Sequence, residues 1–238
     1  MTDILEIKNL KVTYGKSVAV EDVSLSVPEG KIVTVIGANG AGKSTTLNAV
    51  MGLVPIAGGS AAFRGEDITS RKTQDIVRSG LVLVPEGRRL FPYLSVYKNL
   101  LLGTSRRDTK EGVDEDFEYV YNLFPKLKDR LKQKAGTLSG GEQQMVALAR
   151  GIMAAPRLIC LDEPSLGLAP VVIEQLGIAI KDMNERKGLS ILLVEQNVHL
   201  AFGVADYCYT LQVGRLVAEG TVEEIMQNET VKNAYFGE

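Results

Sequence analysis

Residues 32–45, IVTVIGANGAGKST, carry the clearest structural pattern in this chain. The first five residues of this stretch are a nearly continuous run of β-branched, apolar side chains, the pattern of a strand buried on both faces. The loop that follows, from Gly37 to Ser44, matches G-x-x-x-x-G-K-[ST], the pattern of a phosphate-binding loop. Residues 45–50 continue as a predicted helix. A buried strand, a glycine-rich loop and a helix in this order predict an α/β nucleotide-binding core.

This loop is expected to contact the phosphates of a bound nucleotide. Glycines let backbone N–H groups converge on phosphate oxygens, because a side chain would block that approach. We expect the Lys43 ammonium to reach the β- and γ-phosphates of ATP, and the Ser44 hydroxyl to bind Mg²⁺. An ordinary glycine-rich turn is the structural alternative, and the Lys-Ser pair argues against it. The residues predicted to contact ATP here are Gly37, Ala38, Asn39, Gly40, Ala41, Gly42, Lys43, Ser44 and Thr45.

A second predicted strand, the apolar residues 158–161, ends in two carboxylates. A carboxylate at the tip of a parallel strand beside the phosphate loop can hold Mg²⁺ through water, and a second one can orient the attacking water. We therefore predict Asp162 as a metal-binding residue and Glu163 as a catalytic residue, together with Lys43. Solvated carboxylates with a structural role are the alternative. Cys160 lies inside this strand and is predicted to be a core residue.

The segment LSGGEQ, residues 138–143, stands before a predicted helix at residues 144–154. Ser139 and Glu142 have the spacing of a capping box, which is the structural interpretation of the segment. Gly140 and Gly141 are unfavourable in the first turn of a helix, but they leave its N-terminal amides bare. Such a surface suits a γ-phosphate, so the segment can both cap its helix and bind a phosphate.

The phosphate loop, LSGGEQ and the LDEP segment at residues 161–164 together resemble the ATP-binding cassette (ABC) ATPases, over essentially the whole chain. The resemblance implies an α/β P-loop NTPase fold with a RecA-like core and a mixed or parallel sheet. It also implies an N-terminal antiparallel β-subdomain and an inserted α-helical subdomain. We expect one ABC ATPase domain over residues 1–238, with the catalytic core at 1–86 and 156–238. The helical insertion, which carries the LSGGEQ signature, is expected at 87–155.

The same resemblance implies ATP and Mg²⁺ as cofactors and a second ABC ATPase subunit as a partner. In that family the signature of one subunit closes over ATP held by the phosphate loop of another, in a head-to-tail dimer. Ser139, Gly140, Gly141 and Glu142 would therefore contact the ATP of the partner subunit. Tyr14 is expected to stack on the adenine, with an ordinary strand aromatic as the alternative.

Three positions differ from the commonest pattern of the family. Glu86 stands where glutamine is usual, and we expect its carboxylate to approach Mg²⁺ or a water bound to it. Ala169 replaces an aspartate at the dimer seam, and Gln196 replaces the histidine that contacts the γ-phosphate. The Gln196 amide can donate a hydrogen bond but has no titrating proton. Hydrolysis should therefore depend weakly on pH near the pKa of a histidine, and His199 is expected to be a surface or helix residue without a catalytic role.

The variant segments VPEGRRLFP, LDEPSLGLAP and LLVEQN resemble one ATPase of the high-affinity branched-chain amino acid importers. Such importers use two different ATPases, two membrane permease subunits and a periplasmic or extracellular substrate-binding protein, and close relatives serve amides and urea. The resemblance implies a motor subunit at the inner face of the cell membrane. Arg88, Arg89, Phe91 and Tyr93 are the expected docking surface for the permease, with packing of the two aromatics onto the core as the alternative.

The composition limits the other classes of function. Of the 238 residues 45% are hydrophobic and 24% are charged, as in an ordinary globular protein. A net charge of −2 does not favour binding to nucleic acid. A soluble ABC factor of DNA repair or translation would usually carry two cassettes or long arms, and a P-loop kinase would need neither LSGGE nor Glu163. Two cysteines predict a reducing environment, and a single histidine excludes a histidine-rich metal site. The lack of a ~20-residue apolar run predicts no transmembrane segment, which fits the cytoplasmic subunit that the importer resemblance implies.

Hydrophobic periodicity predicts the remaining elements. Between Phe117 and Leu131 apolar residues recur at steps of three and four, which predicts one helical face that Pro125 should divide. The other expected elements are strands at residues 81–84 and 190–194, a helix at 73–79, a hairpin formed by 211–213 and 216–218, and a helix at 222–235.

Overall fold

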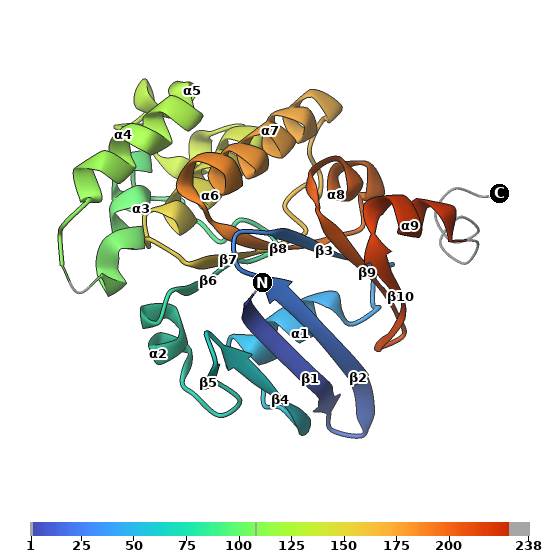
Figure 1. Cartoon of the computed structure of the whole chain (residues 1–238). Helices are drawn as coiled ribbons and strands as arrows, with labels where there is room; N and C mark the ends of the chain where they lie inside the picture. The colour runs from blue at the N-terminus through green and yellow to red at the C-terminus, as the bar shows by residue number, and fades with distance from the viewer. Residues whose placement is uncertain (1, 108, 229–238) are drawn as a thin grey trace.

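The computed structural model describes residues 2–107 and 109–228 (Figure 1). Strand β3 (Ile32–Ile36), which leads into the glycine-rich loop, pairs in parallel with β8 (Ser190–Glu195) on one side and β9 (Tyr207–Gln212) on the other. Beyond β8 lie β7 (Leu158–Asp162) and β6 (Leu81–Val84), which are also parallel. Every residue of β3 and β7 is buried, as the apolar runs predict. The carboxyl ends of these strands share one edge of the sheet, where the glycine-rich loop and the two carboxylates follow.

The N-terminal residues form an antiparallel part of the sheet. β1 (Asp3–Tyr14) pairs with β2 (Ser17–Pro28) on one side and with β4 (Gly58–Phe63) on the other. The short strand β5 (Glu66–Asp67) pairs with β4 at the edge. This arrangement agrees with the antiparallel β-subdomain expected from the sequence.

Strand β10 (Arg215–Thr221) joins the two parts of the sheet. It runs antiparallel to β9 and meets β2 in parallel at Arg215 and Asp22. The strands described follow the order β5-β4-β1-β2-β10-β9-β3-β8-β7-β6. The sheet is therefore mixed, with its parallel strands gathered at the end that carries the phosphate loop.

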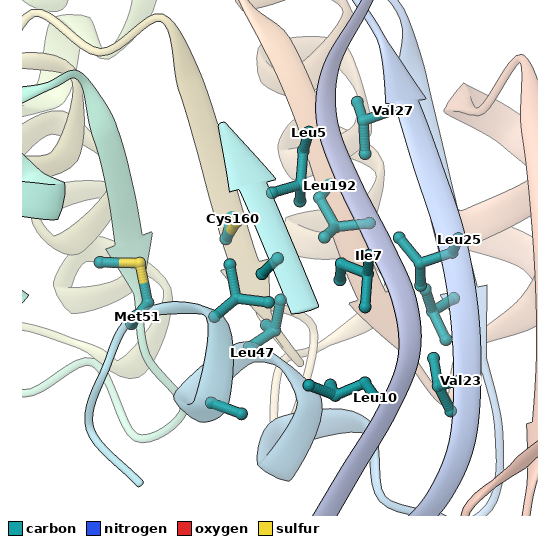
Figure 2. Close-up of a cluster of buried hydrophobic side chains, with 14 of the residues drawn as sticks. Leu5, Ile7, Leu10, Val23, Leu25, Val27, Leu47, Met51, Cys160 and Leu192 are labelled. Carbon is teal, nitrogen blue, oxygen red and sulfur yellow. The ribbon is translucent and has the colours of Figure 1, made fainter. Parts of the chain in front are cut away.

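Helix α1 (Lys43–Val50) lies between the antiparallel and the parallel strands (Figure 1). It begins two residues before the start expected from the sequence. One hydrophobic cluster draws its side chains from both sets of strands and from this helix, and Figure 2 labels among them Leu5, Ile7, Leu47, Cys160 and Leu192. Packing on two sides holds the first turn of α1, and with it Lys43 and Ser44, in a fixed position.

The opposite face of the parallel strands is covered by helices (Figure 1). Side chains of a strand alternate between its two faces, so Leu158 and Cys160 of β7 belong to the cluster around α1, whereas Ile159 and Leu161 belong to the helical cluster. The helices that contribute to this second cluster are α3 (Val96–Gly103), α4 (Val113–Leu123), α5 (Pro125–Lys128), α6 (Gly140–Ile152), α7 (Pro170–Lys187) and α8 (Val198–Val204).

Helix α4 is attached to α7 by polar contacts as well as by apolar packing. The Asp116 carboxylate accepts a hydrogen bond from Lys187 Nζ at 2.5 Å and pairs with the guanidinium of Arg107. The Tyr119 hydroxyl donates to Asp182 of α7 at 2.8 Å. These contacts fix the position of α4 relative to the end of α7.

The elements predicted from periodicity are largely confirmed. Residues 81–84 form β6, the helix expected at 73–79 is α2 (Thr73–Arg78), and the predicted hairpin is β9 and β10 with longer strands. Pro125 separates α4 from α5 as expected. The expectation that this helical face continues to Leu131 is wrong, because the chain turns after α5, with the Arg130 N–H bonded to the Leu127 carbonyl.

At the C-terminal end the helix is shorter than predicted. α9 (Val222–Gln227) ends where Asn228 adopts an extended backbone with φ −72° and ψ 119°. Residues 229–235 of the predicted helix lie outside the described residues. Two short 3₁₀ turns, η1 (Thr104–Arg106) and η2 (Ala135–Thr137), complete the described elements.

The predicted α/β class with a mixed sheet is confirmed. None of the helices in the described ranges combines the length and the apolarity that a membrane span requires. The boundaries 87–155 of the helical insertion remain a prediction, and α3 to α6 fall within them.

Candidate nucleotide-binding site

The phosphate loop leads from β3 into α1 through a backbone turn at Gly42. Gly42 has φ +106°, a conformation that residues with a side chain rarely adopt. A Cβ atom at this position would lie 2.8 Å from the carbonyl oxygen of Ala19 on β2. The glycine is therefore required both by the turn and by the close approach of β2. Just after it, the Thr46 hydroxyl donates to the Gly42 carbonyl at 2.9 Å and holds the first turn of α1.

Lys43 lies almost completely inside the loop, with 4% of its surface exposed. Its Nζ atom donates to the carbonyl oxygens of Gly37 at 2.8 Å and Ala38 at 3.0 Å. The same atom forms an ion pair with Glu163 Oε1 at 2.9 Å. Because the ammonium has three protons, these acceptors satisfy it completely. The geometry brings the lysine and the carboxylate of two separate predicted motifs into direct contact.

Ser44 and Asp162 form a second link between the two motifs. The Ser44 hydroxyl donates to Asp162 Oδ1 at 2.8 Å. Burial raises the pKa of Asp162, and the neighbouring carboxylates of Glu163 and Glu86 add to this rise, whereas the hydrogen bond from Ser44 opposes it. The carboxylates of Glu163 and Glu86 thus repel that of Asp162, and a cation bound beside Asp162 would relieve this repulsion.

The oxygen atoms of this site fit magnesium. Mg²⁺ is usually bound through one or two carboxylates together with waters and substrate phosphates, instead of a complete cage of protein ligands. Ser44 and Asp162 offer one hydroxyl and one carboxylate, with Glu86 and Glu163 nearby. In the described part of the chain no three acidic, histidine or cysteine side chains gather as a metal cage. The donor set therefore suits a cation that arrives with a nucleotide.

A cavity of about 340 Å³ opens over these residues. It brings together side chains from the loop, from the end of β7 and from the segment after β6. Its lining consists of Ala19, Asn39, Gly40, Gly42, Lys43, Ser44, Thr45, Glu86, Glu163 and Leu166. Most of the predicted phosphate and metal residues thus face one space of the size of a small-molecule site.

Glu163 is held in an unusual backbone conformation at the edge of this cavity. Its φ of +43° lies in the left-handed region, which is uncommon for a residue with a side chain. Its N–H donates to the carbonyl oxygen of Val194 on β8 at 2.8 Å. Gln196 follows β8 directly and has an exposed side chain outside the cavity lining. His199 is exposed and lies on α8, as expected for a surface or helix residue.

The signature segment forms the predicted capping box. The Glu142 N–H donates to Ser139 Oγ at 3.4 Å, and the Ser139 N–H donates to Glu142 Oε2 at 2.9 Å. The Arg88 guanidinium lies over the first turn, where a Cβ atom on Gly140 would be only 3.1 Å from its Nη2 atom. The segment does not line the cavity of the phosphate loop: Ser139, Gly141 and Glu142 border a separate cavity of about 400 Å³.

Tyr14 is also absent from the cavity lining. It ends β1 with 51% of its surface exposed. Cys160 is fully buried in β7, and burial raises the pKa of its thiol to about 12. The prediction that Cys160 is a core residue and no nucleophile agrees with this environment.

Sequence reasoning missed several contacts of the site. Ala19 and Leu166 line the cavity, although neither stands in a recognised motif. Ser165 and Glu195 are buried together beside Glu163, and both side-chain oxygens of Glu195 are hydrogen-bonded. The available signal for Glu195 was its position directly after the apolar run 191–194, which places a charged residue at the end of a buried strand. A buried charge requires hydrogen-bond or ionic partners, so this position predicts a polar contact.

The family to which the chain belongs follows from comparison with known proteins. The ABC transporter family profile matches residues 20–166, which is more than half of the chain. A second profile, described as branched-chain amino acid ATP-binding cassette transporter, matches residues 215–238. The chain belongs to the ABC transporter family as an ATP-binding cassette, and it is an ATPase of that family. The resemblance found in the sequence is thereby confirmed.

Individual relatives agree with this assignment. The high-affinity branched-chain amino acid transport ATP-binding protein BraG of Pseudomonas aeruginosa is 44% identical over 98% of this chain and 100% of its own length. The lipopolysaccharide export system ATP-binding protein LptB of Escherichia coli is 36% identical over 98% of this chain and 97% of its own. The crystal structure of the ADP conformation of MJ1267, an ATP-binding cassette of an ABC transporter, superimposes with a TM-score of 0.88 at 26% identity and covers 100% of both chains.

Proposed function

We propose that this chain is the ATP-hydrolysing motor subunit of an ABC importer for branched-chain amino acids. The observation that carries the proposal is the convergence of Lys43, Ser44, Asp162 and Glu163 at the carboxyl ends of β3 and β7, beside one cavity. Phosphoryl transfer needs positioning and charge stabilisation more than covalent chemistry. A buried ammonium and a set of carboxylates beside a glycine-rich loop provide both.

Each residue then has a defined role. The amides of residues 37–45 and the Lys43 ammonium bind the phosphates of ATP, and Ser44 and Asp162 hold Mg²⁺, with Glu86 near the metal or its water. Magnesium neutralises charge on the phosphates when it is bound. Glu163 accepts a proton from the attacking water and orients it. Gln196 donates a hydrogen bond toward the γ-phosphate, and Tyr14 stacks on the adenine.

A second cassette completes the site in this proposal. The signature residues Ser139, Gly141 and Glu142 border a different cavity from the phosphate loop of the same chain, and Gly140 lies between them. They are therefore free to close over the nucleotide of another ATPase subunit, in a head-to-tail dimer. The resemblance to importers with two different ATPases favours a heterodimer.

The permease is proposed to dock at the entry of the helical insertion, on the inner face of the cell membrane. Phe91 is 52% exposed and Tyr93 is 85% exposed. Exposed aromatic residues are enriched at protein interfaces, so this exposure favours docking over the alternative in which both side chains pack onto the core. Arg88 is less available than expected, because it lies against Gly140.

The transported solute is proposed from similarity alone, since the ATPase has no contact with it. The match of residues 215–238 to the branched-chain amino acid profile and the 44% identity to BraG favour branched-chain amino acids. A substrate-binding protein would deliver them to the permease. An importer of amides or urea is the alternative, and a soluble ABC factor without a transporter is a second one.

Gentle solubilisation of membranes from the source cells and pull-down of the tagged full chain test this proposal. We expect two membrane permeases and a second ABC ATPase to co-purify, and uptake of labelled leucine to fall when the chain is deleted. Recovery of ribosomes or DNA without membrane subunits would contradict the importer. Normal leucine uptake with loss of amide or urea uptake would assign the complex to the related importers.

A further inference from the structure

Glu195, the last residue of β8, is a buried carboxylate with hydrogen bonds in two directions. It is 1% exposed. Its Oε1 atom accepts from the Ser165 N–H at 2.9 Å, and its Oε2 atom accepts from the Ser165 hydroxyl at 2.8 Å. Oε2 also accepts from the backbone N–H groups of Gln196 at 3.2 Å and Asn197 at 3.1 Å. One side chain thus ties the segment after β7 to the segment after β8.

We infer that Glu195 is a positioning residue for ATP hydrolysis, which holds Glu163 and Gln196 in a fixed relation at the edge of the nucleotide cavity. This inference rests on the proposed function, in which Glu163 acts on the attacking water. Glu195 lines no part of the cavity and touches no reacting atom. It acts through the backbone of the two segments that carry the catalytic groups.

The backbone of Glu163 needs such support. A residue with a side chain at φ +43° is strained, and strain of this kind persists only when the surroundings hold it in place. On one side, the Glu163 N–H is bonded to the Val194 carbonyl. Two residues later, Ser165 is bonded through both its N–H and its hydroxyl to Glu195. Val194 and Glu195, which are consecutive residues of β8, therefore hold the backbone at Glu163 and at Ser165.

Burial raises the pKa of Glu195, and the hydrogen bonds from Ser165 and Asn197 oppose this rise by stabilising the charged form. In the described ranges Glu195 forms no ion pair with lysine, arginine or histidine. Ser165, Gln196 and Asn197 all donate to Glu195 in this network, so both of its carboxylate oxygens act as acceptors. An amide of the same shape would direct its NH₂ group either at the Ser165 N–H or, in the other orientation, at the N–H groups of Gln196 and Asn197. The substitution Glu195→Gln should therefore break at least one hydrogen bond of the network without changing the volume of the side chain.

A structural role alone predicts a different outcome from a positioning role. If Glu195 only stabilised the fold, its loss would lower the melting temperature and leave the turnover of the folded enzyme unchanged. If it positions Glu163, its loss must lower kcat while the affinity for ATP stays, because the phosphate loop is untouched. Small displacements of a catalytic group can cost up to ~100-fold in rate.

The test measures ATP hydrolysis by the full chain assembled with the subunits that co-purify with it. For Glu195→Gln we expect kcat to fall by ~10–100-fold, with KM for ATP and the dissociation constant of a fluorescent ATP analogue within about twofold of wild type. The matched control is Glu219→Gln, the same change at an exposed position on β10, which should behave as wild type. Ser165→Ala removes one hydroxyl from the network and should lower kcat by a smaller factor than Glu195→Gln does. If Glu195→Gln does not fold, Ser165→Ala replaces it as the test variant.

A double-mutant cycle decides whether the effect passes through Glu163. Single-turnover hydrolysis by Glu163→Gln should fall by a much smaller factor than that of wild type when Glu195→Gln is added, because Glu163, the main group being positioned, is already lost. Equal losses in both backgrounds, or a loss of ATP affinity that matches the loss of kcat, would overturn the inference. Unchanged turnover of Glu163→Gln by itself would instead overturn the role of Glu163 in the proposed function, whatever Glu195→Gln does.

Discussion

Lys43 is the residue on which nucleotide binding should depend most. Its ammonium is buried and oriented by two loop carbonyls and by Glu163. We expect Lys43→Ala to weaken ATP binding by ~100-fold or more, because charge-assisted hydrogen bonds to phosphate contribute about 1.5–3 kcal/mol each. Titration with a fluorescent ATP analogue measures this, with the exposed Lys132→Ala as the control. Retained affinity in Lys43→Ala would contradict the assignment of the loop.

Glu163 should separate hydrolysis from binding. Glu163→Gln keeps the shape of the side chain but removes the base, so we expect ATP to bind and turnover to fall by ~10²–10⁴-fold. Phosphate release by the assembled complex measures the turnover, and the fluorescent analogue measures the binding. If hydrolysis continues at the wild-type rate, the base lies elsewhere or in the site of the partner subunit.

Gln196 has a consequence for the pH dependence of the enzyme. An amide does not titrate between pH 5 and 8, so the change of activity that follows titration of a switch histidine near pH ~6.5 should be missing. The pH profile of kcat for the complex tests this, with His199→Ala as the control for the one histidine of the chain. A sharp change centred near this pH that survives His199→Ala would count against Gln196 as the switch residue.

At the level of single residues, the sequence predicts the catalytic and binding residues that belong to motifs. It misses the residues that keep those motif residues in position. Lys43, Ser44, Asp162 and Glu163 converge because a strand and its following loop carry each of them to one edge of the sheet. Glu195 was not predicted, since its partner Ser165 is thirty residues away in sequence and no periodicity joins the two positions. Tertiary packing likewise determines which motifs of one chain border the same cavity, so the separation of the phosphate loop from the signature segment could not be predicted from their spacing.

Among the elements, the crossing of α3 and α6 depends on a glycine. A Cβ atom on Gly103 would lie 2.3 Å from the Arg150 carbonyl oxygen and 2.8 Å from Met153 Cβ, both on or next to α6. We expect Gly103→Ala to lower the free energy of unfolding by ~1–3 kcal/mol, the usual cost of overpacking. Urea denaturation measures the change.

Gly203 in α8 is the matched control for this substitution. A Cβ atom added to Gly203 would meet no neighbouring atom within 4 Å, and its φ is not positive. Gly203→Ala should therefore stabilise the chain by up to ~1 kcal/mol, because alanine is favoured over glycine inside a helix. A stable Gly103→Ala variant would show that α3 can shift away from α6 at little cost.

The elements themselves were predictable where a periodic pattern was long or uninterrupted. β3 and β6 coincide with their apolar runs, and the capping box marks the start of α6 at Gly140. The turn after α5 was not predicted, because Leu131 continues the spacing of a helical face while the backbone has already left the helix. Apolar spacing reports which side chains are buried, and a turn can bury the next one equally well.

For the whole molecule, the two cysteines report the integrity of the sheet. Cys160 on β7 and Cys208 on β9 are fully buried, and burial raises the pKa of each thiol to about 12. Because the thiolate is the reactive form, we expect Ellman's reagent to detect no thiol in the native chain and both after denaturation. Reaction of either cysteine under native conditions would reveal local opening of the strands.

Helix α1 is enclosed by strands from distant parts of the chain, and this has a consequence for how the protein can be divided. The stretch that the ABC transporter profile matches, residues 20–166, contains every phosphate-loop residue but excludes β1, β8 and β9. In a chain cut to that stretch, β3 would lose both of its parallel neighbours, and the cluster that contains Leu47 would lose Leu5 and Ile7. The stretch that this profile matches is thus smaller than the unit that folds, and a chain shortened to it would keep Lys43, Ser44, Asp162 and Glu163 but lose the packing that holds them in place.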